Sequence, residues 1–261
     1  MHAHRCFLPA RMMITLLVLG VLLFCREPAG IGLLRCCLAM GHGEARAADE
    51  SDLYQSRRAD MVEEQIRARG VRSAAVLDAM TRVPRHLFVP EAAIKYAYDD
   101  TPLPIGYGQT ISQPYIVGFM TEMLNLQPHA RVLEVGTGSG YQAAVLAELG
   151  VEVYTIEIIA ELAQSAADRL RTRYPQNVHA RQADGFFGWP EKAPFDAIMV
   201  TAAAEFVPPP LLEQLKEGGR MVIPVGTPFL VQTLMLVEKS NGEIITRSLF
   251  PVSFVPLRRA P

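Results

Sequence analysis

The sequence predicts an α/β fold, a mostly parallel, doubly wound sheet with an antiparallel C-terminal hairpin and an N-terminal helical extension. From residue 131 onward, short apolar runs rich in β-branched residues alternate with helical patterns, which is typical of a parallel sheet covered on both faces. Asn241-Gly242 separates the last two strand-like runs, and this pair is a strong hairpin signal. Residues 56–81 carry apolar positions at three-four spacing instead, which indicates amphipathic helices.

The first 48 residues differ from the rest of the 261-residue chain. They contain a 14-residue run, 12–25, with a single polar residue, which has the length of a signal-peptide core and is too short for a membrane span. An A-x-A pattern follows at Ala45 and Ala47. The residues leave four alternatives open for this segment: an export signal, a membrane tether, a disordered extension or a mis-called start.

Charge and cysteine content restrict the chemistry of the body. The first 48 residues hold five of the 25 basic and two of the 27 acidic side chains, so the remainder carries a net charge of −5. A mildly acidic body argues against a nucleic-acid partner, because phosphates require clustered Lys and Arg. We expect no disulfide and no thiolate metal site in the body, because all cysteines fall in the first segment, at Cys6, Cys25, Cys36 and Cys37, and we assign no metal ligands there.

Residues 49–130 are expected to be a helical part built around one irregular loop. Two short amphipathic helices occupy 56–81 and are separated at Gly70, and helix returns over 116–126. Between them, LPIGYGQTISQPY at 103–115 contains two glycines and two prolines. We therefore expect this stretch to form a loop without a helix or a strand.

Residues 131–261 are expected to form the α/β domain, as one catalytic unit with 49–130. The predicted parallel strands are 131–135, 151–157, 177–182, 195–200 and 219–225, and the predicted hairpin strands are 232–239 and 243–250. Helical spacing occurs between these runs, at 142–149, 162–173 and 209–217.

The glycine-rich stretch LEVGTGSGY at 133–141 ends the first strand and opens a helix. Glycines there let the main chain approach a ligand closely, and Glu157, which ends the next strand, can accept hydrogen bonds from a ribose diol. The loop reads E-x-G-x-G-x-G with Glu134 first, which favours S-adenosylmethionine over a dinucleotide and leaves both open. A P-loop is excluded, because no Gly-Lys-Ser/Thr occurs.

Asp184 and Ser112 are further candidate site residues. Asp184 follows the third strand, where it can accept a hydrogen bond from an adenine amino group, although Asp-Gly is also an ordinary turn pair. Ser112 lies in the irregular loop and is a candidate nucleophile. A serine triad is disfavoured, because the body lacks G-x-S-x-G and its only histidines are His86, His129 and His179.

With GYGQTISQPY, LEVGTGSGYQ, ADG, PFDAIMVTAA and FVPL in that order, the chain resembles the protein-L-isoaspartate O-methyltransferase family from about residue 56 to 258. The TISQP stretch is the most specific part of this resemblance. It implies a Rossmann-like methyltransferase fold with S-adenosylmethionine as methyl donor. It also implies transfer to the free α-carboxylate of L-isoaspartyl residues in damaged proteins and peptides, followed by collapse to a succinimide.

The resemblance also implies roles for individual residues. The family's active-site serine falls on Ser112, and Gln232 matches a family glutamine near the cofactor less securely. The implied cofactor-binding residues are Thr110, Ile111, Gln113, Glu134, Gly136, Gly138, Gly140, Glu157, Asp184, Gly185 and Gln232. Two departures leave the acids in place: Ile158 stands where many bacterial relatives read Arg, and Ala183 and Phe186 replace the Gly and Trp of G-D-G-W.

Methyl transfer to an ionised carboxylate requires alignment and exclusion of water, but no general base. Ser112 therefore fits as a hydrogen-bond donor that orients the carboxylate, on a loop that closes over the site. Small residues at the carboxyl edge of the sheet are candidate walls for a peptide, at Thr201, Ala202 and Val225. Equally, they can serve only close packing.

Other functions remain to be separated from this one. The alternatives are another S-adenosylmethionine-dependent small-molecule methyltransferase, a nicotinamide-dependent oxidoreductase, and a cofactor-sensing module without activity. A nucleic-acid amino-methyltransferase is disfavoured, because VTAAAEFVPPP stands where an Asn-Pro-Pro-Tyr-like tetrad is expected. We expect a cytoplasmic monomer that acts on isoaspartate-containing proteins, with membrane contact only through the N-terminal segment.

Overall fold

A computed structural model describes residues 53–227 and 230–260. The predicted extension 1–48, including the signal-like run 12–25, lies outside the described residues. Within the part that is described, no helix has both the length and the apolar character needed to cross a membrane.

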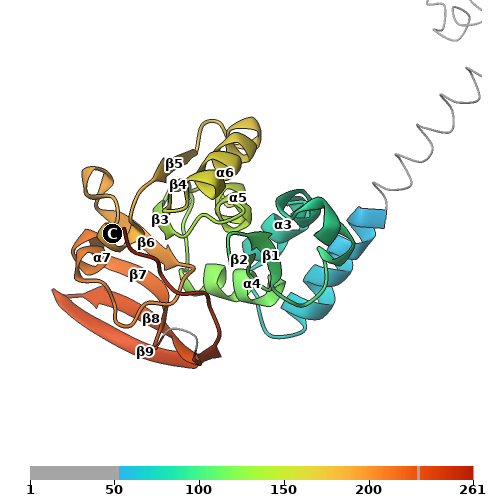
Figure 1. The fold of residues 1–261 in the computed structure, drawn as a ribbon. Coiled ribbons are helices and arrows are strands. Elements are labelled where there is room, and N and C mark those ends of the chain that lie inside the picture. The colour runs from blue at the N-terminus through green and yellow to red at the C-terminus, as the bar shows by residue number, and fades with distance from the viewer. Residues whose placement is uncertain (1–52, 228–229, 261) are drawn as a thin grey trace, which may run out of the picture. The chain divides into compact units, whose positions relative to one another are not determined.

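A seven-stranded sheet forms the centre of the fold, in the order β5-β4-β3-β6-β7-β8-β9 (Figure 1). Neighbouring strands from β5 to β7 are parallel, and β8 and β9 are antiparallel. The predicted α/β fold, with its mostly parallel sheet and C-terminal hairpin, is confirmed. The strands are β3 Arg131–Val135, β4 Glu152–Glu157, β5 Val178–Gln182, β6 Phe195–Val200, β7 Leu215–Val225, β8 Gln232–Ser240 and β9 Glu243–Val252.

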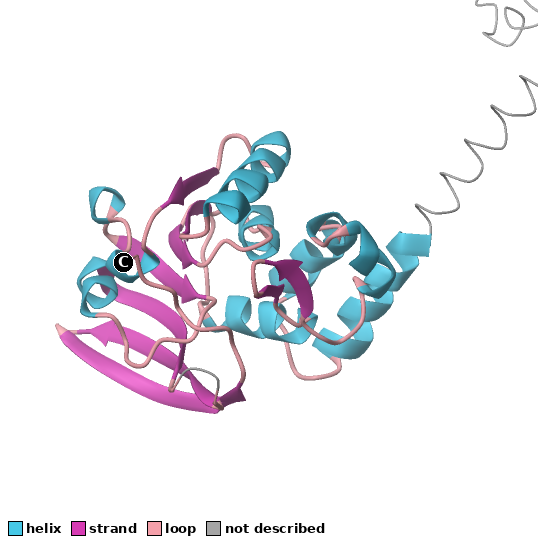
Figure 2. Cartoon of the chain, viewed as in Figure 1, coloured by secondary structure: helices cyan, strands magenta, loops and turns pink. Residues whose placement is uncertain are grey.

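Both faces of the sheet are buried, because alternate residues of each central strand belong to different cores. Val132 of β3 packs in one core with α5 (Tyr141–Glu148) and α6 (Ala160–Arg173). Leu133, the next residue, packs in the other core with α7 (Pro209–Gln214). Helices therefore flank the sheet on both sides (Figure 2). The continuous apolar character of the strands follows from this double burial.

The N-terminal part is helical, as predicted. A π-helix, η1 (Met61–Arg67), is followed by α3 (Ala74–Arg82), whose N-cap Ser73 accepts a hydrogen bond from the Val76 amide at 3.4 Å. Two short 3-10 helices, η2 (Arg85–Phe88) and η3 (Glu91–Tyr96), precede α4 (Pro114–Met123). Two more short 3-10 turns, η4 (Gly185–Phe187) and η5 (Pro190–Lys192), lie beyond β5.

The sequence led us to expect a loop without strands at 103–115, and this prediction is wrong. The stretch contains two short antiparallel strands, β1 (Leu103–Gly106) and β2 (Gln109–Ile111). Tyr107 and Gly108 connect them with φ values of 53° and 71°, the backbone twist that favours a two-residue hairpin turn. The glycines of this stretch therefore allow the positive φ angles of a hairpin turn.

One predicted helix, 209–217, is shorter than expected. It ends at Gln214, because Leu215 already pairs with Phe195 of β6 and is buried. Packing of Leu215 in the sheet therefore overrides the helical pattern of the sequence.

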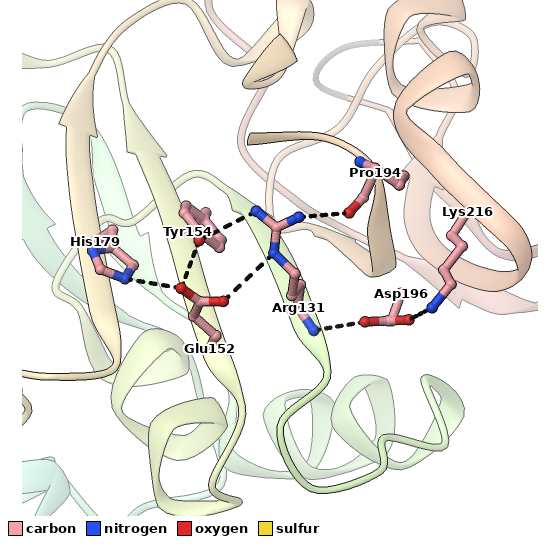
Figure 3. A network of polar contacts seen from close by, with 7 residues as sticks. All are labelled: Arg131, Glu152, Tyr154, His179, Pro194, Asp196 and Lys216. Carbon is pink, nitrogen blue, oxygen red and sulfur yellow. Dashed lines mark hydrogen bonds and ion pairs between the residues drawn. The ribbon is translucent and has the colours of Figure 1, made fainter. Parts of the chain in front are cut away.

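A polar network joins the strands near their amino ends, at the edge opposite the glycine loop (Figure 3). The Arg131 amide donates to Asp196 Oδ2 at 2.8 Å, and Lys216 Nζ donates to Asp196 Oδ1 at 2.6 Å. The Arg131 guanidinium donates to the Tyr154 hydroxyl, which in turn donates to Glu152 at 2.6 Å. His179 and the Pro194 carbonyl complete the network.

We expect Asp196→Ala to lower the free energy of unfolding at pH 7 by about 1–3 kcal/mol, because it removes two charge-assisted hydrogen bonds. Partial burial would raise the pKa of Asp196, but the Arg131 amide and Lys216 outweigh it and lower the pKa below the usual 3.8. The stability that ionised Asp196 contributes is fully present above its usual pKa of 3.8 and is lost as the pH falls through its lowered pKa. Urea denaturation at pH 7 and at lower pH measures both effects.

The exposed Asp168→Ala is the matched control, and it should cost less than about 1 kcal/mol. Equal destabilisation by the two substitutions at pH 7 would contradict the prediction.

Candidate active site

The glycine loop between β3 and α5 lies close to the end of β6. Gly136 has φ of 99°, and a Cβ there would lie 2.4 Å from Thr201 Oγ1. The Thr201 amide donates to the Val135 carbonyl at 2.9 Å, and its hydroxyl lies 2.7 Å from the Gly136 carbonyl. Thr201 therefore fastens the loop to β6, and only glycine fits opposite it.

Glu157 closes the other side of this loop, at the carboxyl end of β4. Its Oε2 accepts from the Gly138 amide at 2.8 Å and its Oε1 accepts from the Ile159 amide at 3.0 Å. The residue is 7% exposed and lines a cavity. Each carboxylate oxygen keeps a further lone pair, so a ligand hydroxyl can be bound as well.

Glu134 lies behind the loop, with its carboxyl group fully buried. The Thr155 hydroxyl donates to Oε2 at 2.5 Å, and Oε1 has no hydrogen-bond partner in the described part of the chain. Burial raises the pKa of Glu134 to about 8 against a usual 4.5, the Thr155 hydrogen bond opposes this, and Glu157 adds to it. An unpartnered buried oxygen is costly, which is consistent with a carboxyl group kept for a charged ligand nearby.

Three cavities meet beside this loop. The first is lined by Gly136, Gly138 and Glu157, and the second is a groove of about 500 Å³ beside Ser112. A third, small cavity extends from Ser112 along the glycine loop to Tyr141. The hairpin and the end of β6 supply two residues that line all three cavities, Thr110 and Thr201. A ligand at the glycine loop and one in the groove would therefore meet at these threonines and Ser112.

Ser112 lies between β2 and α4 and is half-buried. Its carbonyl accepts from Arg85 Nη2 at 2.7 Å. Among the described residues its hydroxyl has no histidine or carboxylate partner, so the arrangement is not that of an activated nucleophile. The hydroxyl remains available as a donor to a ligand.

The segment after β9 covers the first cavity. The Ala203 amide donates to the Val255 carbonyl at 2.8 Å, and the Leu257 amide donates to the Ala203 carbonyl at 2.7 Å. Arg258 reaches the hairpin, where it donates to the Tyr107 carbonyl at 3.0 Å. In Figure 1 this dark red segment runs back from β9 toward β6 and α7. Residues 255–258 thus line the cavity together with the glycine loop.

Asp184 is held by the same segment. Its Oδ2 accepts from Arg259 Nε at 2.9 Å and from the Ala260 amide at 3.1 Å, and its Oδ1 accepts from the Phe186 amide. The Arg259 guanidinium also stacks on Phe186, 3.7 Å from the ring centroid. Partial burial would raise the pKa of Asp184, but these donors lower it.

The sequence-predicted site residues separate into two groups. Those that line at least one of the three cavities are Thr110, Ile111, Ser112, Gln113, Gly136, Gly138, Glu157, Gly185, Thr201 and Ala202. Those that line none of the three are Glu134, Gly140, Asp184, Val225 and Gln232.

The second group supports the site from outside. Gly140 caps α5 with φ of 85° and leaves room for Leu170. Gln232 accepts from the Phe254 amide at 2.8 Å and so anchors the covering segment. Val225 forms a β-bridge with Ala204.

Sequence reasoning missed several cavity residues. Arg69, Tyr115 and Phe250 line the groove, and Gln109 lines the first cavity. Arg85, which donates to the Ser112 carbonyl, was not among the predicted site residues. The terminal FVPL motif was the one sequence signal for the covering segment, and it did not predict where in the fold this segment lies.

Comparisons with known proteins identify one family. A family model described as Protein-L-isoaspartate(D-aspartate) O-methyltransferase (PCMT) matches residues 56–260. The chain is 54% identical over 242 residues to Protein-L-isoaspartate O-methyltransferase 2 of Syntrophobacter fumaroxidans, which covers 89% of this chain and 98% of that protein. It is 58% identical over 217 residues to Protein-L-isoaspartate O-methyltransferase of Opitutus terrae, with 83% and 93% covered.

A solved structure shares the fold. It is described as a Plasmodium falciparum protein-L-isoaspartate O-methyltransferase in complex with S-adenosyl-L-homocysteine, with a TM-score of 0.68 and 29% identity. The match covers 77% of this chain and 98% of that one.

We expect Glu134→Gln to change how stability depends on pH. Unfolding returns the pKa of Glu134 from about 8 to the usual 4.5, so the free energy of unfolding falls as the pH rises between these values. Without this ionisation, the variant should show a flatter profile and should exceed the parent chain in stability above pH 8. Urea denaturation over a pH series measures it. The exposed Glu243→Gln is the control, and a parent-like slope in the Glu134 variant would contradict the prediction.

Proposed function

The chain belongs to the protein-L-isoaspartate(D-aspartate) O-methyltransferase family, and on this premise we propose how its site performs the reaction. The enzyme transfers a methyl group from S-adenosylmethionine to the free α-carboxylate of L-isoaspartyl residues in damaged proteins and peptides. The ester then collapses to a succinimide, which reopens partly to aspartate and so initiates repair. The observation that carries this assignment is that the glycine-loop cavity and the groove beside Ser112 share two lining residues, Thr110 and Thr201.

The residues around the glycine loop suit the cofactor. A Cβ at Gly136 would clash with Thr201, so the loop keeps its main chain free for close contact. Glu157 keeps lone pairs for the ribose hydroxyls, and Glu134 places a buried hydrogen-bond acceptor, Oε1, behind the loop. Bound S-adenosylmethionine supplies an electrophilic methyl group on its sulfonium.

The remaining predicted residues complete the cofactor site in this proposal. Gly185 lies at the adenine end of the site. Asp184 accepts a hydrogen bond from the adenine amino group, either through the second lone pair of Oδ1 or through Oδ2 once Arg259 has moved away from it. Thr110, Ile111 and Gln113 form the wall nearest the methyl group. Gly140 and Gln232 support the site without lining it. Gly140 caps the start of α5, and Gln232 accepts a hydrogen bond from the Phe254 amide.

The chain's own task is to orient the substrate carboxylate, which is already ionised at neutral pH. The Ser112 hydroxyl donates to one carboxylate oxygen and turns the other toward the methyl group. Thr201 and Ala202 form the wall at the edge of β6, and Val225 supports that wall through Ala204. The preceding hairpin and residues 255–258 exclude water from the reacting atoms. Alignment and exclusion of water account for catalysis without a general base.

Isoaspartate-containing proteins are the partners of this enzyme as substrates. We further propose that the body acts as a monomer in the cytoplasm, because its methyl donor is made there. Any membrane contact would then depend on the segment 12–25. Cell fractionation together with size-exclusion chromatography tests both points, and a membrane-bound or oligomeric active form would overturn them.

The reaction is tested with paired peptides that differ only in isoaspartate or aspartate at one position. With labelled S-adenosylmethionine, we expect base-labile label on the isoaspartyl peptide alone. Equal labelling of both peptides, or labelling of neither, would refute the assignment.

Ser112→Ala should lower kcat/KM for the isoaspartyl peptide about 10- to 100-fold, because one hydrogen bond to a charged group is worth about 1.5–3 kcal/mol. The fold should be unaffected, as circular dichroism and thermal unfolding will show. Ser248→Ala is the matched control, since Ser248 is exposed on β9 and lines none of the three cavities, and it should keep parent kinetics. Unchanged kinetics in the Ser112 variant would remove Ser112 from the mechanism.

A further inference from the structure

Arg85 is a buried cation directly behind Ser112. It follows Pro84 at the start of η2, and its side chain is 0% exposed. Its Nε donates to the Ala97 carbonyl at 2.8 Å, and its Nη2 donates to the Ser112 carbonyl at 2.7 Å. The guanidinium also lies 4.9 Å from the centroid of the Tyr141 ring.

In the part of the chain that the structure describes, no carboxylate compensates this charge. Among the described residues Arg85 forms no ion pair, and its Nη1 has no hydrogen-bond partner. Burial lowers the pKa of Arg85 to about 10, so the group stays charged at neutral pH. Burying an unpaired charge is unfavourable for folding. Stability alone therefore does not explain why an arginine occupies this position.

The Ser112 peptide needs an external support. It lies outside both β2 and α4, so neither element holds it through its regular hydrogen bonds. Pro114, two residues later, has no N–H to contribute. The bond from Arg85 is thus a fixed point for the segment that carries the Ser112 hydroxyl.

Arg85 also connects this segment to the glycine loop. Tyr141, the first residue of α5, follows that loop directly and lines the small cavity that Ser112 shares. One guanidinium therefore contacts both the substrate side and the cofactor side of the site. Its two hydrogen bonds require the planar fork of arginine, which a lysine cannot reproduce.

We propose that Arg85 is a positioning residue for methyl transfer. It holds the Ser112 peptide in register with the glycine loop, and its buried charge offsets the negative charge of the substrate carboxylate that Ser112 receives. This inference rests on the proposed function.

The test compares Arg85→Met, which removes the charge and the donors, with Arg85→Lys, which keeps the charge and one donor. We expect both variants to fold and to bind S-adenosylmethionine with little change. We expect kcat for the isoaspartyl peptide to fall about 10- to 100-fold in the Met variant, because a small misplacement of reacting groups has effects of this size. The Lys variant should recover part of kcat, and KM for the peptide should rise more in the Met variant.

Arg58→Met is the matched control. Arg58 also donates to a main-chain carbonyl of the helical part, that of Thr81, but it does not contact the TISQP segment. It should keep parent kinetics.

Parent-like kcat and KM in a folded Arg85→Met variant would overturn the proposal, as would a loss of activity that merely follows the folded fraction. If the Met variant does not fold, a folded Lys variant with parent kcat overturns it equally. Failure of the proposed function looks different, because the parent chain itself would then not label the isoaspartyl peptide.

Discussion

The rest of the site depends on the contact between Thr201 and the glycine loop. β3 and β6 are parallel neighbours, so their carboxyl ends lie side by side. Thr201 bonds the carbonyls of Val135 and Gly136 at this point, and the contact leaves no room for a side chain on Gly136. The main chain of the loop therefore lines the first cavity without side chains at Gly136 and Gly138, and Thr201 lines both this cavity and the groove. If this spacing were relaxed, the two ligand sites would no longer share a wall.

Two buried ionisable side chains lie behind the main chain of this site. Glu134 lies behind the glycine loop, and Arg85 lies behind Ser112, each with one polar atom left unpartnered in the described structure. The reaction brings together a sulfonium and a carboxylate, so neither charge has to exchange a proton. The fixed charge of Arg85 behind a main-chain carbonyl can stabilise such a pair without competing for it, whereas Glu134, with its raised pKa, is neutral at neutral pH. The polar network at the amino ends of the strands is a separate, structural use of charge (Figure 3).

The sheet could be predicted from the sequence because its central strands are buried on both faces and read as continuous apolar runs. The glycine loop and Glu157 were predictable because their spacing is set by one strand-loop-helix unit. The hairpin at Tyr107 was missed because its glycines read equally well as loop. Leu215 was misplaced because its partner, Phe195, lies 20 residues away in the sequence. Arg85 and Arg259 have no local signal at all, since their roles are defined by Ser112 and Asp184, which lie 27 and 75 residues away.

The covering segment closes the site through contacts between residues that are far apart in the sequence. Residues 255–258 close a cavity that is also lined by a glycine loop more than a hundred residues earlier, and Arg258 donates to a carbonyl 151 residues upstream. Such distant contacts form slowly and are among the first to open. The sheet can therefore be folded while the pocket is still open. Proteolytic cleavage near Phe254 would return the mature protein to that state, folded but with an open pocket.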